Sequence, residues 1–131
     1  MGKPGVFTSY RDVESLSVGQ VLERSAQIAP EKVCVFFKDQ CLTYKALNEQ
    51  SNAIASSLQQ VGIRKGDRVA VYVPNCPELY IIFYGLQKIG AIVAWVNPGY
   101  RTEELKFILS NSQAKAVFVQ KGKGDEPERR V

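Results

Sequence analysis

The feature that most constrains the fold is an alternation of short apolar runs and amphipathic segments after residue 67. The apolar runs 68–73, 91–96 and 115–119 are rich in valine and alanine, a composition that favours buried strands. The segments between them, 77–89 and 102–112, carry apolar residues at helical spacing. Strands separated by helices of about a dozen residues pair in parallel through right-handed crossovers. The sequence therefore predicts a βαβαβ unit of the α/β class.

Two more helices are predicted ahead of this unit. Ser17 and Gln20 have the spacing of a capping box, and the apolar positions that follow keep a helical period until Pro30. Thr43 is expected to cap a second helix, which Gly62 ends.

A short β-hairpin is predicted between these two helices. Residues 33–37 are rich in β-branched and aromatic side chains, a polar break follows at 38–40, and 41–43 form the returning strand. Aromatic side chains on predicted buried faces are interpreted as core, and a ligand pocket lined by them is the alternative. These residues are Phe36, Phe37, Phe83, Trp95 and Phe107.

A chain of 131 residues is long enough for one domain with its own core. We assign residues 1–16 to an irregular amino-terminal segment, 17–119 to the domain, and 120–131 to a disordered or loosely attached tail, because the tail is polar and carries glycines and a proline. The apolar segment 79–96 is interrupted near its middle, so it is interpreted as a helix and a strand instead of a transmembrane helix.

Charge and composition argue against several classes of function. The net charge of +4 comes from basic residues interleaved with acidic ones, which argues against nucleic-acid binding. The chain has no histidine, and its three cysteines form no CxxC pair, so a zinc site is not expected. Cys34, Cys41 and Cys76 are interpreted as reduced and structural. The first residues lack the apolar stretch of a secretory signal, which favours an intracellular protein, cytoplasmic or associated with an organelle membrane.

Few residues suggest chemistry of their own. Without histidine there is no triad, and neither GxGxxG nor GxxxxGK[ST] occurs. Asp67 and Arg68 fit a binding site or a solvated turn, and the turn is the simpler interpretation. Asn97, Pro98 and Tyr100 follow a strand where α/β sheets bind ligands, but a turn that positions Tyr100 for packing is favoured.

Four motifs in order resemble the adenylate-forming superfamily of acyl-CoA synthetases, peptide-synthetase adenylation domains and luciferases. Residues 42–47, LTYKAL, are similar to the family's L-[TS]-Y-x-E-L motif, and 62–77, GIRKGDRVAVYVPNCP, resemble its G-x-x-x-G-D-x-V-A segment. Residues 86–98, LQKIGAIVAWVNP, are similar to its L-K-x-G-A motif. Residues 97–105, NPGYRTEEL, resemble the N-P-x-Y-T-x-x-E-L stretch of the fatty acyl-CoA synthetase branch.

The sequence also departs from the family pattern. Ala46 stands where the family usually has Glu, and Gln40 replaces a hairpin Gly, which would cost about 1 kcal/mol if that position were left-handed. The family's phosphate loop TSGTTGxPKG has no counterpart in the 131 residues, nor do its ribose-binding Asp and catalytic Lys. Accordingly, no catalytic, cofactor-binding or metal-binding residue is assigned to this chain.

The resemblance implies part of the amino-terminal domain of an acyl-CoA synthetase-like ligase. Such a parent uses ATP, Mg²⁺ and CoA to convert a fatty acid or related carboxylate into acyl-AMP and then into acyl-CoA, whereas no cofactor is expected for this chain alone. Its expected partners are the remainder of the ligase or a second copy of itself. The alternative is a non-catalytic interaction module or truncated isoform, which an exposed apolar sheet face or edge would favour.

Overall fold

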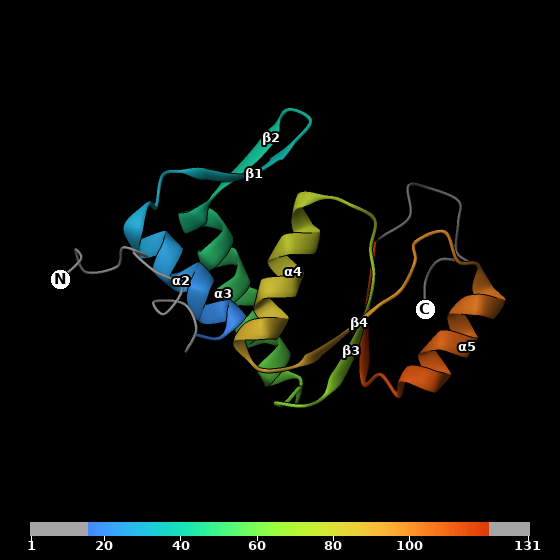
Figure 1. The fold of residues 1–131 in the computed structure, drawn as a ribbon. Helices are drawn as coiled ribbons and strands as arrows, with labels where there is room; N and C mark the ends of the chain where they lie inside the picture. The colour runs from blue at the N-terminus through green and yellow to red at the C-terminus, as the bar shows by residue number, and fades with distance from the viewer. Residues whose placement is uncertain (1–15, 121–131) are drawn as a thin grey trace.

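The computed structural model describes residues 16–120, in which helices and a hairpin lead into a small sheet (Figure 1). The predicted irregular segment 1–16, apart from its last residue, and the predicted tail 120–131, apart from its first, lie outside the described residues. The elements in chain order are α2 (Val18–Ile28), β1 (Val33–Phe37), β2 (Gln40–Thr43), α3 (Tyr44–Gln60), β3 (Arg68–Tyr72), α4 (Pro77–Lys88), β4 (Ile92–Trp95), α5 (Thr102–Ser112) and β5 (Ala116–Val119).

The three-stranded sheet has β3 at its centre, in the order β4-β3-β5, and both neighbours run parallel to β3. This confirms the predicted βαβαβ unit and the α/β class. Each strand is slightly shorter than its predicted run. For β3 and β4, burial continues past the hydrogen-bonded ladder at Val73 and Ala91.

The central strand β3 is buried on both faces because helices cover both sides of the sheet (Figure 1). Val69, Val71 and Val73 share one core cluster with residues of α3 and α4. Ala70 and Tyr72, which point the other way, share a second cluster with Leu105 and other residues of α5. A strand enclosed in this way reads as a continuous apolar run, which explains the sequence 69–73.

A third core cluster joins the hairpin to the helices. Leu22 of α2, Val35 of β1, Leu47 of α3 and Ile81 of α4 are buried together. β1 and β2 pair antiparallel, as predicted, with an irregularity in register between Val33 and Val35. The helices therefore hold one end of the hairpin, and its turn projects away from them (Figure 1).

The predicted start and stop signals are present. The Ser17 side chain accepts a hydrogen bond from the Gln20 N–H, and the Gln20 side chain accepts one from the Ser17 N–H. The predicted capping box is therefore confirmed. The Thr43 hydroxyl caps α3 through the Ala46 N–H, and Gly62 follows α3 with φ of +94°.

The hairpin turn corrects one prediction. Lys38, with φ of 55°, takes the left-handed conformation, whereas Gln40 is the first residue of β2 and pairs with Phe37. The expected strain at Gln40 is therefore absent. The left-handed position lies earlier in the turn, where Lys38 also sits over the Phe37 ring at 5.4 Å from its centroid.

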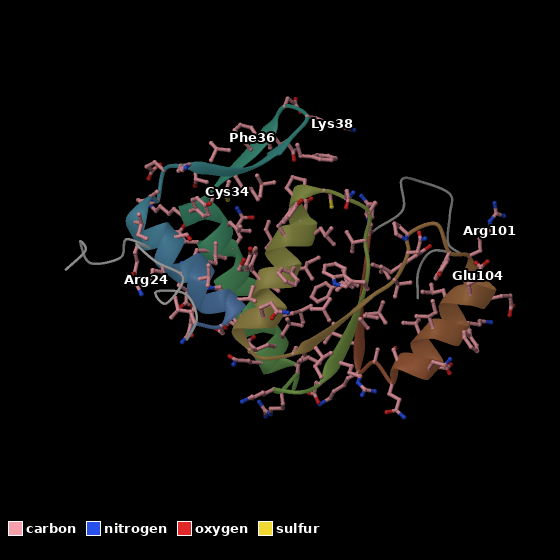
Figure 2. All side chains as sticks on the ribbon, in the orientation of Figure 1. Arg24, Cys34, Phe36, Lys38, Arg101 and Glu104 are labelled. Carbon is pink, nitrogen blue, oxygen red and sulfur yellow. The ribbon has the colours of Figure 1, made fainter. Side chains whose placement is uncertain are left out.

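The prediction that all five aromatic residues belong to the core is wrong for three of them. Phe36 is 77% exposed, Trp95 55% and Phe107 66%, whereas Phe37 and Phe83 are half-buried. Phe36 is on the outer face of the hairpin (Figure 2), Trp95 is on an edge strand, and Phe107 is on the face of α5 opposite Leu105 and Leu109, which pack on the sheet. Apolar periodicity does not show which faces are left uncovered.

The contact between α3 and α4 depends on small residues. A Cβ atom at Gly85 would lie 2.6 Å from Ile54 Cγ2 and 3.2 Å from the Ser51 carbonyl oxygen. Ser51 is fully buried and Ala55 is buried on the same side of α3. The helices approach closely because position 85 has no side chain.

We expect Gly85→Ala to lower the free energy of unfolding by about 1–3 kcal/mol, because the added methyl overpacks this contact. Urea denaturation followed by circular dichroism measures the change. Ser56→Ala, at an exposed position of the same helix pair, is the control and should change stability by less than about 0.5 kcal/mol. A stabilisation of about 1 kcal/mol, which helix propensity alone would give, would contradict the close contact.

Candidate functional site

The loops that follow β3 and β4 lie at the carboxyl edge of the sheet, where open α/β sheets bind ligands. The Tyr72 hydroxyl is 2.6 Å from the carbonyl oxygen of Tyr100 and 3.3 Å from that of Pro98. Asn97 Oδ1 accepts a hydrogen bond from the Gly99 N–H at 2.8 Å. The loop after β4 is thus stabilised by its own side chains.

These contacts favour the turn interpretation of Asn97, Pro98 and Tyr100. The Asn97 side chain forms an Asx turn, and the Tyr100 side chain packs against the cluster that covers one face of β3. Tyr72 is the first of two residues that sequence reasoning missed. Its position within the apolar run 69–73 was the available signal, because a buried tyrosine usually requires a hydrogen-bond partner.

Asp67 and Arg68 also have structural roles. Asp67 Oδ2 accepts a hydrogen bond from the Arg64 N–H at 2.6 Å and lies 3.1 Å from Lys115 Nζ. The Arg64 N–H, with help from Lys115, lowers the pKa of the Asp67 carboxyl. Arg68 reaches the carbonyl oxygen of Ser112 at 3.3 Å. Both residues therefore fasten the start of β3 to its neighbours, as the turn interpretation requires.

Lys88 is the second residue that sequence reasoning missed. Its side chain is 5% exposed, and its Nζ lies 3.1 Å from Glu23 Oε1 and 2.7 Å from Asn48 Oδ1. The ammonium group thus links α4 to α2 and α3. A lone lysine at the end of an apolar helix was the signal for it. Its partners lie 65 and 40 positions away in the sequence, so they could not be identified from spacing.

The thiols are poorly suited to nucleophilic chemistry. Burial raises the pKa of Cys34 and of Cys76, which keeps both thiols protonated near neutral pH. Cys34 Sγ contacts the carbonyl oxygen of Leu42 at 3.5 Å. Cys41 is exposed, and all three cysteines are free.

An open polar groove lies between α2 and α3 and has a volume of about 490 Å³. It combines carboxylates, amides and one lysine, so it offers hydrogen bonds and ion pairing. Its lining residues are Glu23, Ala26, Gln27, Pro30, Glu31, Lys45, Asn48, Glu49 and Asn52. None of these side chains is a nucleophile paired with a general base.

The described part of the chain, 16–120, brings together no group of three or more side chains that could hold a metal ion. Over the same residues, no helix has the length and apolar character needed to cross a membrane. The ion pair Lys88–Glu23 joins α4 to α2, and the ion pair Lys115–Asp67 joins the residues that directly precede β5 and β3. Both ion pairs therefore help to hold the fold together.

The lowered pKa of Asp67 predicts a pH dependence of stability. A carboxyl whose pKa is lower in the folded state stabilises the fold above its unfolded pKa, about 3.9, and loses that effect as pH falls through the folded value. We expect Asp67→Asn to destabilise the chain at pH 6 and to have a smaller effect below pH 3. Urea denaturation at both pH values tests this, with Asp39→Asn in the exposed hairpin turn as the control. An equal effect of Asp67→Asn at both pH values would contradict it.

Comparison with known proteins identifies relatives of this chain. Residues 22–131 match the family described as AMP-binding enzyme. Over 103 residues the chain is 38% identical to the crotonobetaine/carnitine–CoA ligase of Salmonella paratyphi A, covering 75% of this chain and 20% of the ligase. It is also 34% identical over 102 residues to bacitracin synthase 3 of Bacillus licheniformis, covering 78% of this chain and 2% of the synthase.

Solved structures show the same similarity in three dimensions. The fold matches the amino-terminal subdomain of Klebsiella oxytoca NpsA with a TM-score of 0.73 and 33% identity, over 78% of this chain and 27% of that one. It matches a Mycobacterium tuberculosis fatty acyl CoA synthetase with a TM-score of 0.73 and 36% identity, over 77% of this chain and 20% of that one. The chain thus spans about a fifth of the Salmonella ligase and of the Mycobacterium synthetase, and about a quarter of the NpsA subdomain. With its parallel sheet and with most of its residues matched, the chain belongs to the AMP-binding enzyme family.

Proposed function

We propose that this chain acts as the amino-terminal part of an AMP-forming acyl ligase and does not catalyse acyl activation by itself. Two observations together support the proposal: the chain belongs to the AMP-binding enzyme family, and its match covers only 20% of the length of the related crotonobetaine/carnitine–CoA ligase. Its role is to build one portion of the enzyme body: a parallel sheet covered on both faces.

The chemistry of adenylation supports the second part of this proposal, that the chain does not catalyse acyl activation by itself. Transfer of a carboxylate to the α-phosphate of ATP requires donors around the triphosphate and a cation held beside the developing charge. Within residues 16–120, the turn after β3 is Pro74-Asn75-Cys76, which has no glycine for close approach of backbone to phosphate. The buried lysine, Lys88, is held by Glu23 and Asn48.

For the complete ligase we propose a fatty acid or related carboxylate as substrate, with ATP, Mg²⁺ and CoA as cofactors. The motif at 97–105 supports the acyl-CoA synthetase branch over the peptide synthetases. Relatives named for carnitine–CoA and fatty acyl CoA ligation point to the same class. An intracellular location accords with the use of ATP and CoA and stays a prediction.

Pyrophosphate exchange tests the proposal directly. The 131-residue chain is incubated with ATP, Mg²⁺, labelled pyrophosphate and a panel of short, medium and long fatty acids and carnitine. We expect no acid-dependent exchange above a boiled control, because the turn after β3 has no glycine that would let the backbone approach a phosphate closely. The Salmonella carnitine–CoA ligase serves as the positive control. Acid-dependent exchange, or micromolar ATP binding that survives moderate salt in calorimetry, would show a complete enzyme.

A chimera tests the first part of the proposal, that the chain acts as the amino-terminal part of an acyl ligase. Residues 17–119 of this chain replace the matching segment of the Salmonella ligase, and exchange is measured with carnitine. We expect a folded chimera to retain exchange, whereas the same chimera with Gly85→Ala should lose thermal stability before activity. A chimera that folds, binds ATP and shows no exchange would favour the alternative, a non-catalytic interaction module. The exposed Trp95 on an edge strand is the observation that favours that alternative.

A further inference from the structure

Folding gathers four basic side chains at the amino edge of the sheet, although one of them is far from the others in the sequence. Because the three strands run parallel, the segments that enter them lie at one end of the molecule, opposite the carboxyl-edge loops (Figure 1). Arg64, Lys65 and Arg68 belong to the segment that enters β3, and Lys115 directly precedes β5. All four residues are exposed, and together they form the basic edge.

Lys115 is joined to the segment 61–68 by short contacts. Its backbone N–H donates to the Arg68 carbonyl oxygen at 2.7 Å, and its Nζ donates to the Gly62 carbonyl oxygen at 2.9 Å. The same Nζ lies 3.1 Å from Asp67 Oδ2. Asp67 is the single acidic residue of the segment 61–68, so the basic edge keeps an excess of positive charge.

Two of the four cations have structural roles, and two do not. Arg68 donates to the Ser112 carbonyl oxygen at the carboxyl end of α5, and Lys115 caps the carboxyl end of α3 in the same way. Among residues 16–120, neither the Arg64 guanidinium nor the Lys65 ammonium forms a hydrogen bond or a salt bridge. The fold does not use these two charges, so they are available to a partner.

Exposed aliphatic side chains lie on the same edge. Val61, which is 73% exposed, begins the segment that carries Arg64 and Lys65. Ile92, which is 49% exposed, is the register partner of Arg68 on the neighbouring strand. The segment 61–68 has no aromatic residue on which a nucleic-acid base could stack. Cations around exposed aliphatic side chains are typical of a surface that meets anionic lipid headgroups.

The charge also decides what can cover this edge. A protein segment packed over it would remove Arg64 and Lys65 from water, and their desolvation is costly unless each one gains an acidic partner. A layer of lipid headgroups leaves both side chains hydrated and offers negative groups at any position along its surface. The basic edge is therefore better suited to a lipid surface than to burial inside a larger enzyme.

We propose that the basic edge docks the chain on a membrane surface that carries anionic lipids, with Arg64 and Lys65 among the headgroups and Val61 at the boundary of the acyl chains. The contact is peripheral and weakens as salt rises. Each cation near such a surface strengthens binding about fivefold, so four cations give half-binding at about 1 mM lipid. The carboxyl edge of the sheet stays free on the opposite side.

Co-sedimentation of the 131-residue chain with vesicles tests this docking. The vesicles contain phosphatidylcholine alone or with about 30% phosphatidylserine, in about 50 mM salt. We expect binding to the anionic vesicles only, and release at about 0.5 M salt. The double variant Arg64→Gln/Lys65→Gln should bind about thirtyfold more weakly, and Val61→Ser about fivefold more weakly. Thermal melting followed by circular dichroism checks that both variants stay folded.

The matched control is the double variant Lys32→Gln/Lys45→Gln, which removes two exposed lysines and the same net charge. Both lie at the opposite end of α3: Lys45 is in its first turn, and the Lys32 carbonyl oxygen accepts a hydrogen bond from the Tyr44 N–H. A helix of 17 residues separates them from the basic edge by about 25 Å, which exceeds the Debye length. The control should change binding by less than about twofold.

Four results would overturn the proposal. Equal loss of binding in the two double variants would reduce the effect to net charge, and equal binding to neutral and anionic vesicles, or none up to about 10 mM lipid, would exclude the docking. Release by about 10 mM inorganic phosphate, but not by chloride at equal ionic strength, would indicate a site for a single phosphate group. A single-stranded oligonucleotide that binds more tightly than the vesicles, and loses binding in Arg64→Gln/Lys65→Gln, would assign the edge to nucleic acid. None of these results bears on catalysis, which pyrophosphate exchange decides separately.

Discussion

The burial of β3 on both faces is the constraint on which the rest of the structure depends. Val69 and Ala70 are completely buried and Val71 nearly so. The Ala70 side chain points to the opposite face of the sheet from those of Val69 and Val71. One strand therefore supplies side chains to two core clusters, one under α3 and α4 and the other under α5. Each fully buried valine contributes about 1.5–3 kcal/mol. Because β3 contributes to both clusters, its loss would disrupt them together.

Much of the fold follows from local sequence signals. The order of elements, the parallel pairing and the capping residues Ser17 and Thr43 were predictable, because they depend on periodicity, β-branched composition and short-range hydrogen bonds. The exposure of Phe36, Trp95 and Phe107 was not predictable in the same way. It depends on which strand is at an edge and on which helix face has no neighbour, and both are consequences of tertiary arrangement.

The polar contacts likewise divide into local contacts, which the sequence predicts, and long-range contacts, which it does not. The Asx turn at Asn97 and the Asp67 turn are local, so the turn interpretation was available from the sequence. The partners of Lys88 and Tyr72 come from elements far apart in the chain, and spacing carries no information on them. Together these contacts fix the helices and the carboxyl-edge loop around the sheet. In this family member, the polar side chains of the described residues therefore provide a frame for the sheet.

The central claim is that a parallel three-stranded sheet around β3 organises this chain. Amide hydrogen exchange, followed by nuclear magnetic resonance on the 131-residue chain, tests it most directly, because amides in the most stable unit open only with global unfolding. The account predicts that the amides of Val69 to Tyr72 exchange most slowly, ahead of those in β4 and β5, with the hairpin amides of 35–42 fastest among the strands. Exchange of the β3 amides as fast as those of the hairpin would contradict it.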